Sequence, residues 1–341
     1  MNAQQRIEAV LNGKETDRRA FAMTLSLYGA RLTKTDAVDY FSDCRLYAAG
    51  QRAVVDLCGP DILFGPFAFA LEAEAFGAIV ERFHDAPPVV RKPAFRGARH
   101  TEGVRRPSPA DHPRLRFLID SVRELVQDQA GERPVAAPII APTDLPNLLV
   151  GMDAWLELLL FEPEPAQFWS RVAIDHFLAL AHAYAEAGAA FLVMPIMMIS
   201  PSFVDQALAD RVLKPLLKEA FERTPIPVVF HHGGNRLTPN LSIYKDLPNL
   251  AGFALDEKDS FKEARDILGP APVLLGNLSG PHVSRRSPAD MEARIRALLA
   301  DRNMDRRYIF ASSGADIPYD TDPGILASIR SILEEPLLAG C

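Results

Sequence analysis

The sequence has few cysteines, with three in 341 residues: Cys44, Cys58 and Cys341. Thiols this far apart cannot make a disulfide framework, and none of them belongs to a CxxC metal-binding motif. Residues 1–7 contain no apolar run of the kind found in secretory signal peptides. We therefore expect a reduced, cytoplasmic protein with no site built from neighbouring cysteines.

The sequence also lacks two kinds of interaction surface. No apolar run approaches the roughly 20 residues that a membrane-spanning helix requires. The net charge is −7, whereas a nucleic-acid-binding surface needs a clustered basic excess. We expect neither a membrane nor a nucleic acid among the partners.

Short apolar runs bounded by turn residues alternate with amphipathic stretches, a pattern that predicts strands and helices in turn. Eight strands are expected, at residues 21–24, 61–64, 135–140, 190–194, 228–231, 252–255, 273–276 and 308–311. Helices are expected at residues 5–11, 46–57, 115–129, 165–187, 205–223, 260–268, 288–301 and 325–334.

This alternation predicts an α/β fold, a (β/α)8 TIM barrel that occupies residues 1–341 as a single domain. An N-terminal helical extension precedes the barrel, and residues 77–112 predict an insertion made of a hairpin and a Pro- and Arg-rich loop. The rival fold, a doubly wound sheet, has no support because no GxGxxG motif follows the first strand. P-loop, HExxH and GxSxG motifs are absent as well.

Two adjacent histidines mark the end of the fifth expected strand, where barrel enzymes place their catalytic groups. Neighbouring residues on an extended strand point to opposite sides, so we expect His231 to face the pocket and His232 to face away. An imidazole at the barrel mouth can polarise or protonate a substrate, which makes His231 the leading catalytic candidate. The alternative is one buried, hydrogen-bonded histidine beside an exposed one.

Acidic and amide residues end three further strands. Asp256 follows the sixth strand and Asp316 the eighth; a carboxyl group there can hold a substrate or move a proton, or it can cap the next helix. We expect Asp316 to be catalytic and Asp256 to bind substrate. Asn277, after the seventh strand, could orient substrate through its amide or form an Asx turn.

The remaining substrate-binding candidates lie at other strand ends and beside His231. They are Glu74, Thr143, Met198, His232 and Asn235. Met198 belongs to a group of methionines that offers a soft apolar wall for a flat cofactor, with core packing as the alternative. No residue is expected to bind a metal.

Several motifs follow one another in an order known from one superfamily. They are Gln5-Arg6-Ile7, Leu11-Asn12-Gly13, Asp17-Arg18, Gly65-Pro66-Phe67, residues 72–77 and 185–189, His231 to Asn235, Asp256-Glu257-Lys258, Gly276-Asn277-Leu278 and residues 313–316. The series resembles the uroporphyrinogen decarboxylase superfamily, and within it the corrinoid-linked methyltransferases of the methylcobamide:coenzyme M type. The resemblance covers nearly the whole chain and implies methyl transfer with a cobamide presented by a separate corrinoid protein.

The sequence departs from the family pattern in two places, and both departures narrow the range of substrates and reactions that the resemblance implies. Uroporphyrinogen decarboxylases carry an Arg-Gln-Ala-Gly-Arg-Tyr segment that binds substrate carboxylates, whereas the equivalent residues 23–29 contain no arginine. The coenzyme M methyltransferases hold zinc with a histidine and two cysteines. Here His231 keeps the histidine, while Gly233 and Ala315 stand where the cysteines would be. Without these thiolates we expect neither zinc nor activation of a thiol acceptor.

The resemblance and the departures together imply a corrinoid-linked methyltransferase with His231 and Asp316 as its catalytic residues. It would move a methyl group between a methylated small molecule or a corrinoid protein and a non-thiol acceptor such as tetrahydrofolate. One alternative is a metal-free decarboxylase for a small carboxylated substrate, with the same two residues as proton donors. Another is a non-catalytic barrel that binds a ligand or a corrinoid protein.

Overall fold

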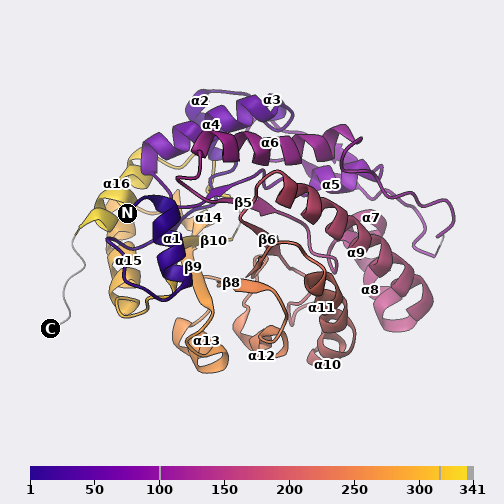
Figure 1. The fold of residues 1–341 in the computed structure, drawn as a ribbon. Helices are drawn as coiled ribbons and strands as arrows, with labels where there is room; N and C mark the ends of the chain where they lie inside the picture. The colour runs from indigo at the N-terminus through magenta and orange to yellow at the C-terminus, as the bar shows by residue number, and fades with distance from the viewer. Residues whose placement is uncertain (100, 315, 336–341) are drawn as a thin grey trace.

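The computed structural model describes residues 1–99, 101–314 and 316–335. Eight parallel strands form one sheet with the order β1-β10-β9-β8-β7-β6-β5-β2, surrounded by helices (Figure 1). The strands are β1 (Phe21–Ala22), β2 (Leu63–Phe64), β5 (Val135–Pro138), β6 (Phe191–Pro195), β7 (Val228–His231), β8 (Leu250–Ala254), β9 (Val273–Ser279) and β10 (Tyr308–Ser313). Each overlaps its predicted range, and the predicted (β/α)8 fold is confirmed.

Most of the longer helices also lie where the sequence predicts them. They are α1 (Ala3–Leu11), α4 (Cys44–Cys58), α6 (Pro113–Gln129), α9 (Pro163–Glu186), α13 (Phe261–Leu268), α15 (Pro288–Asp301) and α16 (Pro323–Glu334). The single helix predicted at residues 205–223 consists of α10 (Gln206–Leu208), a π-helical turn (Ala209–Leu213) and α11 (Lys214–Glu222). Several starts carry the expected caps; Ser260, for example, accepts a hydrogen bond from the Glu263 amide before α13.

Seven further helices of the described chain were not predicted. They are α2 (Tyr28–Thr33), α3 (Ala37–Tyr40), α5 (Ala70–Ala75), α7 (Leu145–Val150), α8 (Met152–Phe161), α12 (Leu241–Tyr244) and α14 (Gly280–Val283). The predicted insertion does contain a hairpin, formed by the antiparallel strands β3 (Ile79–Glu81) and β4 (Val89–Lys92). The hairpin projects toward the C-terminal end of the barrel, where it borders a cavity described below.

The barrel interior is filled largely by small and branched side chains. Ala22, Ala136, Ala254 and Ala311 belong to one buried cluster with valine, leucine and isoleucine side chains of β6, β7, β9 and β10. Side chains on a strand alternate between its two faces. Val229 of β7 belongs to this inner cluster, so the alternation places His231, two residues later, on the inner face at the end of the strand.

Helix α1 covers part of the N-terminal end of the barrel. Ile7 and Val10 pack into the same cluster as the interior residues of the strands. The buried carboxylate of Asp61 lies beside them and accepts hydrogen bonds from Arg6, Arg18 and the backbone amide of Phe21. The Asp61 amide donates to the Phe21 carbonyl at 2.7 Å. Asp61 thus joins β1 to the segment that leads into β2, the two strands at the ends of the sheet order.

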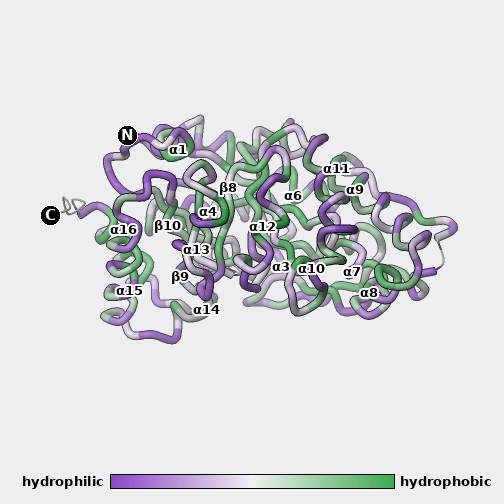
Figure 2. Tube along the Cα trace, turned by 90° about the horizontal axis from the view of Figure 1, so that it is seen from below, coloured by the Kyte–Doolittle hydropathy of each residue, from purple (hydrophilic) through white to green (hydrophobic). Residues whose placement is uncertain are grey.

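Hydrophobic and hydrophilic residues are distributed as expected for a barrel that is surrounded by helices. Hydrophobic stretches follow mainly the strands and the inner sides of the helices, while hydrophilic stretches follow mainly the outer loops (Figure 2). No helix among the described residues is both long enough and apolar enough to cross a bilayer.

Candidate active site

A cavity of about 570 Å³ opens at the C-terminal end of the barrel. Its wall is mostly apolar and includes Leu27, Phe67, Phe69, Ile140, Met197 and Ile317. Its titratable side chains are those of Asp144, His231 and Asp316, and no lysine or arginine of the described chain lines it. An apolar cavity of this size with a few convergent polar groups is the usual form of a small-molecule site.

His231 lies at the base of this cavity, on the inner face of β7. Its Nδ1 atom accepts a hydrogen bond from the Gly233 amide at 3.2 Å. Burial, and to a smaller extent the neighbouring His232, lower the pKa of His231 well below its ordinary value. The ring is therefore neutral near pH 7, and it can polarise a substrate by hydrogen bonding rather than by delivering a proton.

The prediction that the two histidines point to opposite sides is wrong. Their rings are stacked, with centroids 4.4 Å apart and planes 24° apart. The chain turns sharply after His232, because Gly233 and Gly234 both adopt positive φ angles. The Nδ1 atom of each imidazole accepts a hydrogen bond from the backbone amide two residues later, that of Gly233 for His231 and that of Gly234 for His232. The turn thus overrides the alternation of the strand.

His232 is buried behind His231 and holds two loops together instead of lining the cavity. Its Nε2 accepts a hydrogen bond from the Gly314 amide at 2.9 Å, and its Nδ1 lies 3.4 Å from an oxygen of Asp256. A neutral imidazole accepts at one nitrogen only. Both nitrogens of His232 face a backbone amide, Gly234 at Nδ1 (3.0 Å) and Gly314 at Nε2 (2.9 Å), so the neutral ring accepts from one of the two at a time.

Asp316, which follows β10, also lines the cavity. Its Oδ1 accepts a hydrogen bond from the Ser26 amide at 2.6 Å. Burial raises the pKa of Asp316 to about 7, although hydrogen bonds from the Leu27 and Ser26 amides act in the opposite direction. A large fraction of this carboxyl group is therefore protonated at neutral pH and can donate a proton into the cavity.

Asp144 is a cavity residue that the sequence analysis did not select as a candidate. Its Oδ1 accepts from the Met197 amide at 2.7 Å and its Oδ2 from the Thr143 hydroxyl at 2.7 Å. Burial raises its pKa to about 6. Asp144 joins the loops after β5 and β6, and its position directly after the end of the third predicted strand was the available signal.

Thr143 and Met198 are buried next to this group but do not line the cavity. The Thr143 hydroxyl is used by Asp144, and the Met198 amide donates to Asp144 at 3.2 Å. Met197, the neighbour of Met198, is the methionine in the cavity wall. The apolar wall that the sequence analysis assigned to Met198 is therefore formed by Met197.

Four further candidates lie outside the cavity. Asp256 accepts from the Lys258 amide, and Asn277 donates to the carbonyls of Asp256 and Asp259 at 2.9 and 3.1 Å, so these residues organise the loops behind His232. Glu74 forms ion pairs with Arg82 and Arg114. The Asn235 amide donates to the His232 carbonyl, which completes the turn after β7.

The site does not provide the ligands of a zinc ion. No three His, Cys, Asp or Glu side chains within the described residues are grouped so that they could hold a metal. Gly233 has a φ of 61°, and a Cβ atom there would lie 2.6 Å from the backbone of Ile196, so a cysteine at this position would not fit without a shift of the loop. Ala315, at the position of the second family cysteine, lies outside the described residues.

We predict that the purified protein contains far less than one zinc per chain, because zinc sites need three or four protein ligands with oxygen, nitrogen or thiolate donors. Elemental analysis after dialysis measures this directly. Stoichiometric zinc that survives dialysis and is lost in His231→Ala would contradict the prediction.

A family model and several solved structures match this chain. The family model described as uroporphyrinogen decarboxylase (URO-D) matches residues 2–335. A methyltransferase from Methanosarcina mazei has a similar structure, with a TM-score of 0.87 and 18% sequence identity over 98% of this chain and 99% of that one. No curated protein sequence matches the chain.

Two more distant structures share the barrel. A B12-independent methionine synthase from Shewanella sp. W3-18-1 has a TM-score of 0.52 and 11% identity, over 83% of this chain and 84% of that one. A putative vitamin-B12 independent methionine synthase from Listeria monocytogenes has a TM-score of 0.52 and 12% identity, over 95% of this chain and 97% of that one. At these identities the likeness extends to the fold alone.

Proposed function

The chain belongs to the uroporphyrinogen decarboxylase family, and we propose that it is a methyltransferase in which Asp316 and His231 act on a small molecule held in the C-terminal cavity. The observation that carries this proposal is a carboxyl group with a pKa of about 7 in a mostly apolar cavity, which no lysine or arginine of the described residues lines. Such a group is a proton donor matched to neutral pH.

The chemistry of methyl transfer explains why a proton donor is needed. When a methyl group leaves an ether oxygen or an amine nitrogen, the C–O or C–N bond breaks and its electron pair stays on the heteroatom. Protonation of that atom by Asp316 balances the charge and yields an alcohol or amine. His231 is neutral and its Nδ1 accepts from the Gly233 amide, so its Nε2–H group donates one hydrogen bond that fixes the orientation of the same substrate.

The methyl acceptor in this reaction is a cobamide on a separate corrinoid protein, which supplies a strongly nucleophilic cobalt. Apolar residues border the cavity mouth, and they include Pro87, Pro88, Val89 and Val90 of the β3–β4 hairpin. Val89 is 52% exposed. This apolar border supports the docking of a partner that presents a flat cofactor.

The same site could also transfer a methyl group to tetrahydrofolate, with the corrinoid protein as the methyl donor. The methyl group would then pass from the corrinoid protein to a pterin nitrogen, and the ionised form of Asp316 would accept a hydrogen bond from the N–H group of that nitrogen. In this direction the carboxylate afterwards takes up the proton that the nitrogen loses. Neither direction in this proposal uses zinc, because no three ligand side chains among the described residues are grouped so that they could hold it.

Decarboxylation, the activity in the family's name, finds less support in the cavity. A carboxylated substrate needs a cationic partner, and the cavity wall contains none in the described ranges. Arg31, the first arginine after β1, instead donates to the Tyr319 and Thr321 carbonyls and lies over the Tyr28 ring. Asp144 and Asp316 would repel a carboxylate whenever they are ionised.

The proposal is tested by incubating the protein with cob(I)alamin and a panel of aryl methyl ethers and methylated amines, and by following methylcobalamin formation spectroscopically. A second arm supplies methylcobalamin and tetrahydrofolate. Methyl transfer in either arm, lost in Asp316→Asn, is the expected result. Release of carbon dioxide from carboxylated analogues, with no methyl transfer in either arm, would contradict the proposal.

We expect His231→Ala to lower the rate of methyl transfer by about 10- to 100-fold, the contribution of one oriented hydrogen bond in a dry site. His231→Gln retains a hydrogen-bonding group and should recover part of the rate. His232→Ala should instead lower thermal stability, because it leaves the Gly314 amide without its partner. Rates and melting temperatures of the three variants separate the two roles, and equal rates for His231→Ala and the wild type would place the reacting atoms elsewhere.

A further inference from the structure

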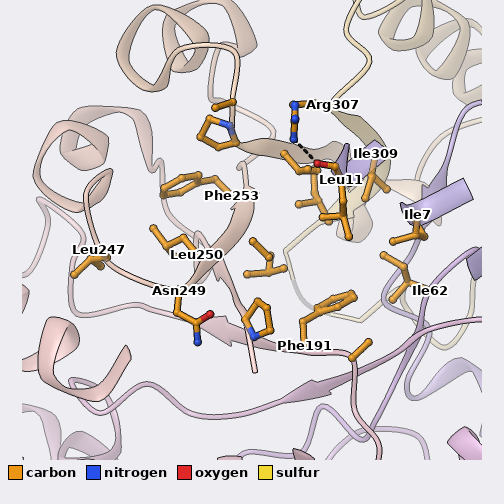
Figure 3. Close-up of a pocket in the computed structure, with 18 of the residues that line it drawn as sticks. Ile7, Leu11, Ile62, Phe191, Leu247, Asn249, Leu250, Phe253, Arg307 and Ile309 are labelled. Atoms are coloured by element: carbon orange, nitrogen blue, oxygen red, sulfur yellow. Dashed lines mark hydrogen bonds between the residues drawn. The ribbon is translucent and has the colours of Figure 1, made fainter. Parts of the chain in front are cut away.

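A second cavity, also of about 570 Å³, opens at the N-terminal end of the barrel, opposite the candidate active site (Figure 3). Its inner surface is the lowest layer of the barrel interior, which includes Ile62, Phe191 and Val229. Ile7 and Leu11 of α1 form one side and leave the rest open (Figure 3). Helix α1 therefore closes this end of the barrel only in part.

The charged groups around this cavity all have the same sign. Lys245 and Arg307 are its titratable lining side chains, and no Asp or Glu of the described chain lines it. Neither cation forms an ion pair with a described carboxylate. Arg307 donates a hydrogen bond from Nη1 to the Leu11 carbonyl, which holds the guanidinium group at the edge of the cavity (Figure 3). The remaining guanidinium N–H groups and the Lys245 ammonium are free to bind an anion.

We propose that this cavity binds a small amphipathic monocarboxylate, with its apolar body against Phe191 and Val229 and its carboxylate group at Arg307 and Lys245. Two features select this class of ligand. The apolar floor favours a hydrocarbon chain or ring, which gains about 25 cal/mol per Å² of apolar surface removed from water. The unpaired cations at the border select a negative head group, because charge-assisted hydrogen bonds to a carboxylate are stronger than neutral ones.

The two ends of the barrel therefore select opposite charges. The C-terminal cavity carries two carboxyl groups and no described lysine or arginine, whereas the N-terminal cavity carries one lysine, one arginine and no described Asp or Glu. A small void of about 20 Å³ separates them, and Phe191, Val229 and His231 all line it. A ligand in the N-terminal cavity would thus rest on the layer directly beneath His231, without access to the catalytic groups.

The first test compares two ligands of equal chain length by titration calorimetry: decanoate and 1-decanol. Decanoate should bind more tightly than decanol, and Lys245→Met and the double variant Lys245→Met/Arg307→Met should weaken decanoate binding, the double variant by at least about tenfold. Decanol binding should not change. The single variant Lys245→Met is included because it should not disturb folding: Lys245 is exposed and pairs with no described carboxylate. The double variant also removes the hydrogen bond from Arg307 to the Leu11 carbonyl, which could affect folding. Arg306→Met, which removes a cation paired with Glu15 outside the cavity, is the matched control.

The second test locates the ligand. A diazirine derivative of decanoate, activated by light, should label peptides that contain residues 245–253 and 307–309. Labelling of residues 67–70 or 140–148 would place decanoate in the upper cavity and overturn the proposal, as would equal decanoate affinity in the wild type and the double variant. Self-association that decanoate does not affect, measured by sedimentation, would show that a second copy covers this face and would also overturn it. None of these measurements requires a methyl donor. They therefore test the proposed carboxylate site independently of the proposed methyl transfer.

Discussion

Replacing Asp316 with asparagine is expected to lower the rate of methyl transfer by about 10²- to 10⁴-fold, the usual contribution of a positioned proton donor. Asparagine has nearly the same shape and can occupy the position beside the Ser26 amide, but it cannot release a proton. Substrate binding should change much less than turnover. A large rise in KM with an unchanged kcat would show that Asp316 only binds the substrate.

The same substitution should not weaken the fold. The folded state holds the Asp316 proton more tightly than the unfolded chain, because burial raises the pKa from 3.8 to about 7. The folded state therefore loses stability as pH rises from about 4 through 7, and this loss is complete above 7. Asp316→Asn removes the titration, so at pH 8 the variant should melt at a temperature equal to or above that of the wild type. A fall in the melting temperature at pH 8 would contradict this assignment of charge.

Asp61→Ala is expected to lower the free energy of unfolding by about 3–5 kcal/mol, the usual cost of removing one partner from a buried ion pair. The Asp61 side chain is fully buried, and its carboxylate binds Arg6 at 2.5 Å and Arg18 at 2.8 Å. Its loss leaves Arg6 paired only with the more exposed Asp17 and leaves the Phe21 amide without its partner. The contact that joins β1 to the approach of β2 is lost at the same time.

Urea denaturation measures this effect. Asp266→Ala is the matched control, because Asp266 pairs with Lys262 on an exposed helix face, where an ion pair contributes less than about 1 kcal/mol. Equal unfolding free energies for the two variants would show that Asp61 does not join β1 and β2. Asp61→Asn should have an intermediate effect, because the amide oxygen can still accept from the Phe21 amide.

The strands of this barrel could be predicted because each is a short apolar run between turn residues, and burial on both sides makes such runs continuous. The helices α7 and α8 were missed for a physical reason. Residues 156–161 are Leu-Glu-Leu-Leu-Leu-Phe, a run too uniformly apolar to show the 3.6-residue period of an amphipathic helix. Pro146 and Gly151 also divide the segment into two short pieces.

The candidate site could be predicted only where a residue's position on its own strand or strand end decides its surroundings. His231 and Asp316 line the cavity for that reason. The direction of His232 depends on a turn made by the next two glycines, and the period of the strand could not reveal it. The position of Asp144 after the third predicted strand was a signal for the cavity, but its link to the Met197 and Met198 amides, more than 50 residues away in the chain, has no signal in the local sequence.

The measurement that tests the central claim most directly is the pH dependence of single-turnover methyl transfer to cob(I)alamin in the wild type and in Asp316→Asn. Below pH 7 the Asp316 carboxyl is protonated and the wild-type rate should be constant; above about pH 7 the rate should fall tenfold for each pH unit. The variant should be slow and should not show this fall. If the rate of the variant falls with pH in the same way as the wild-type rate, the assignment of Asp316 as the proton donor is contradicted. A wild-type rate that does not change between pH 6 and 9 would contradict it as well.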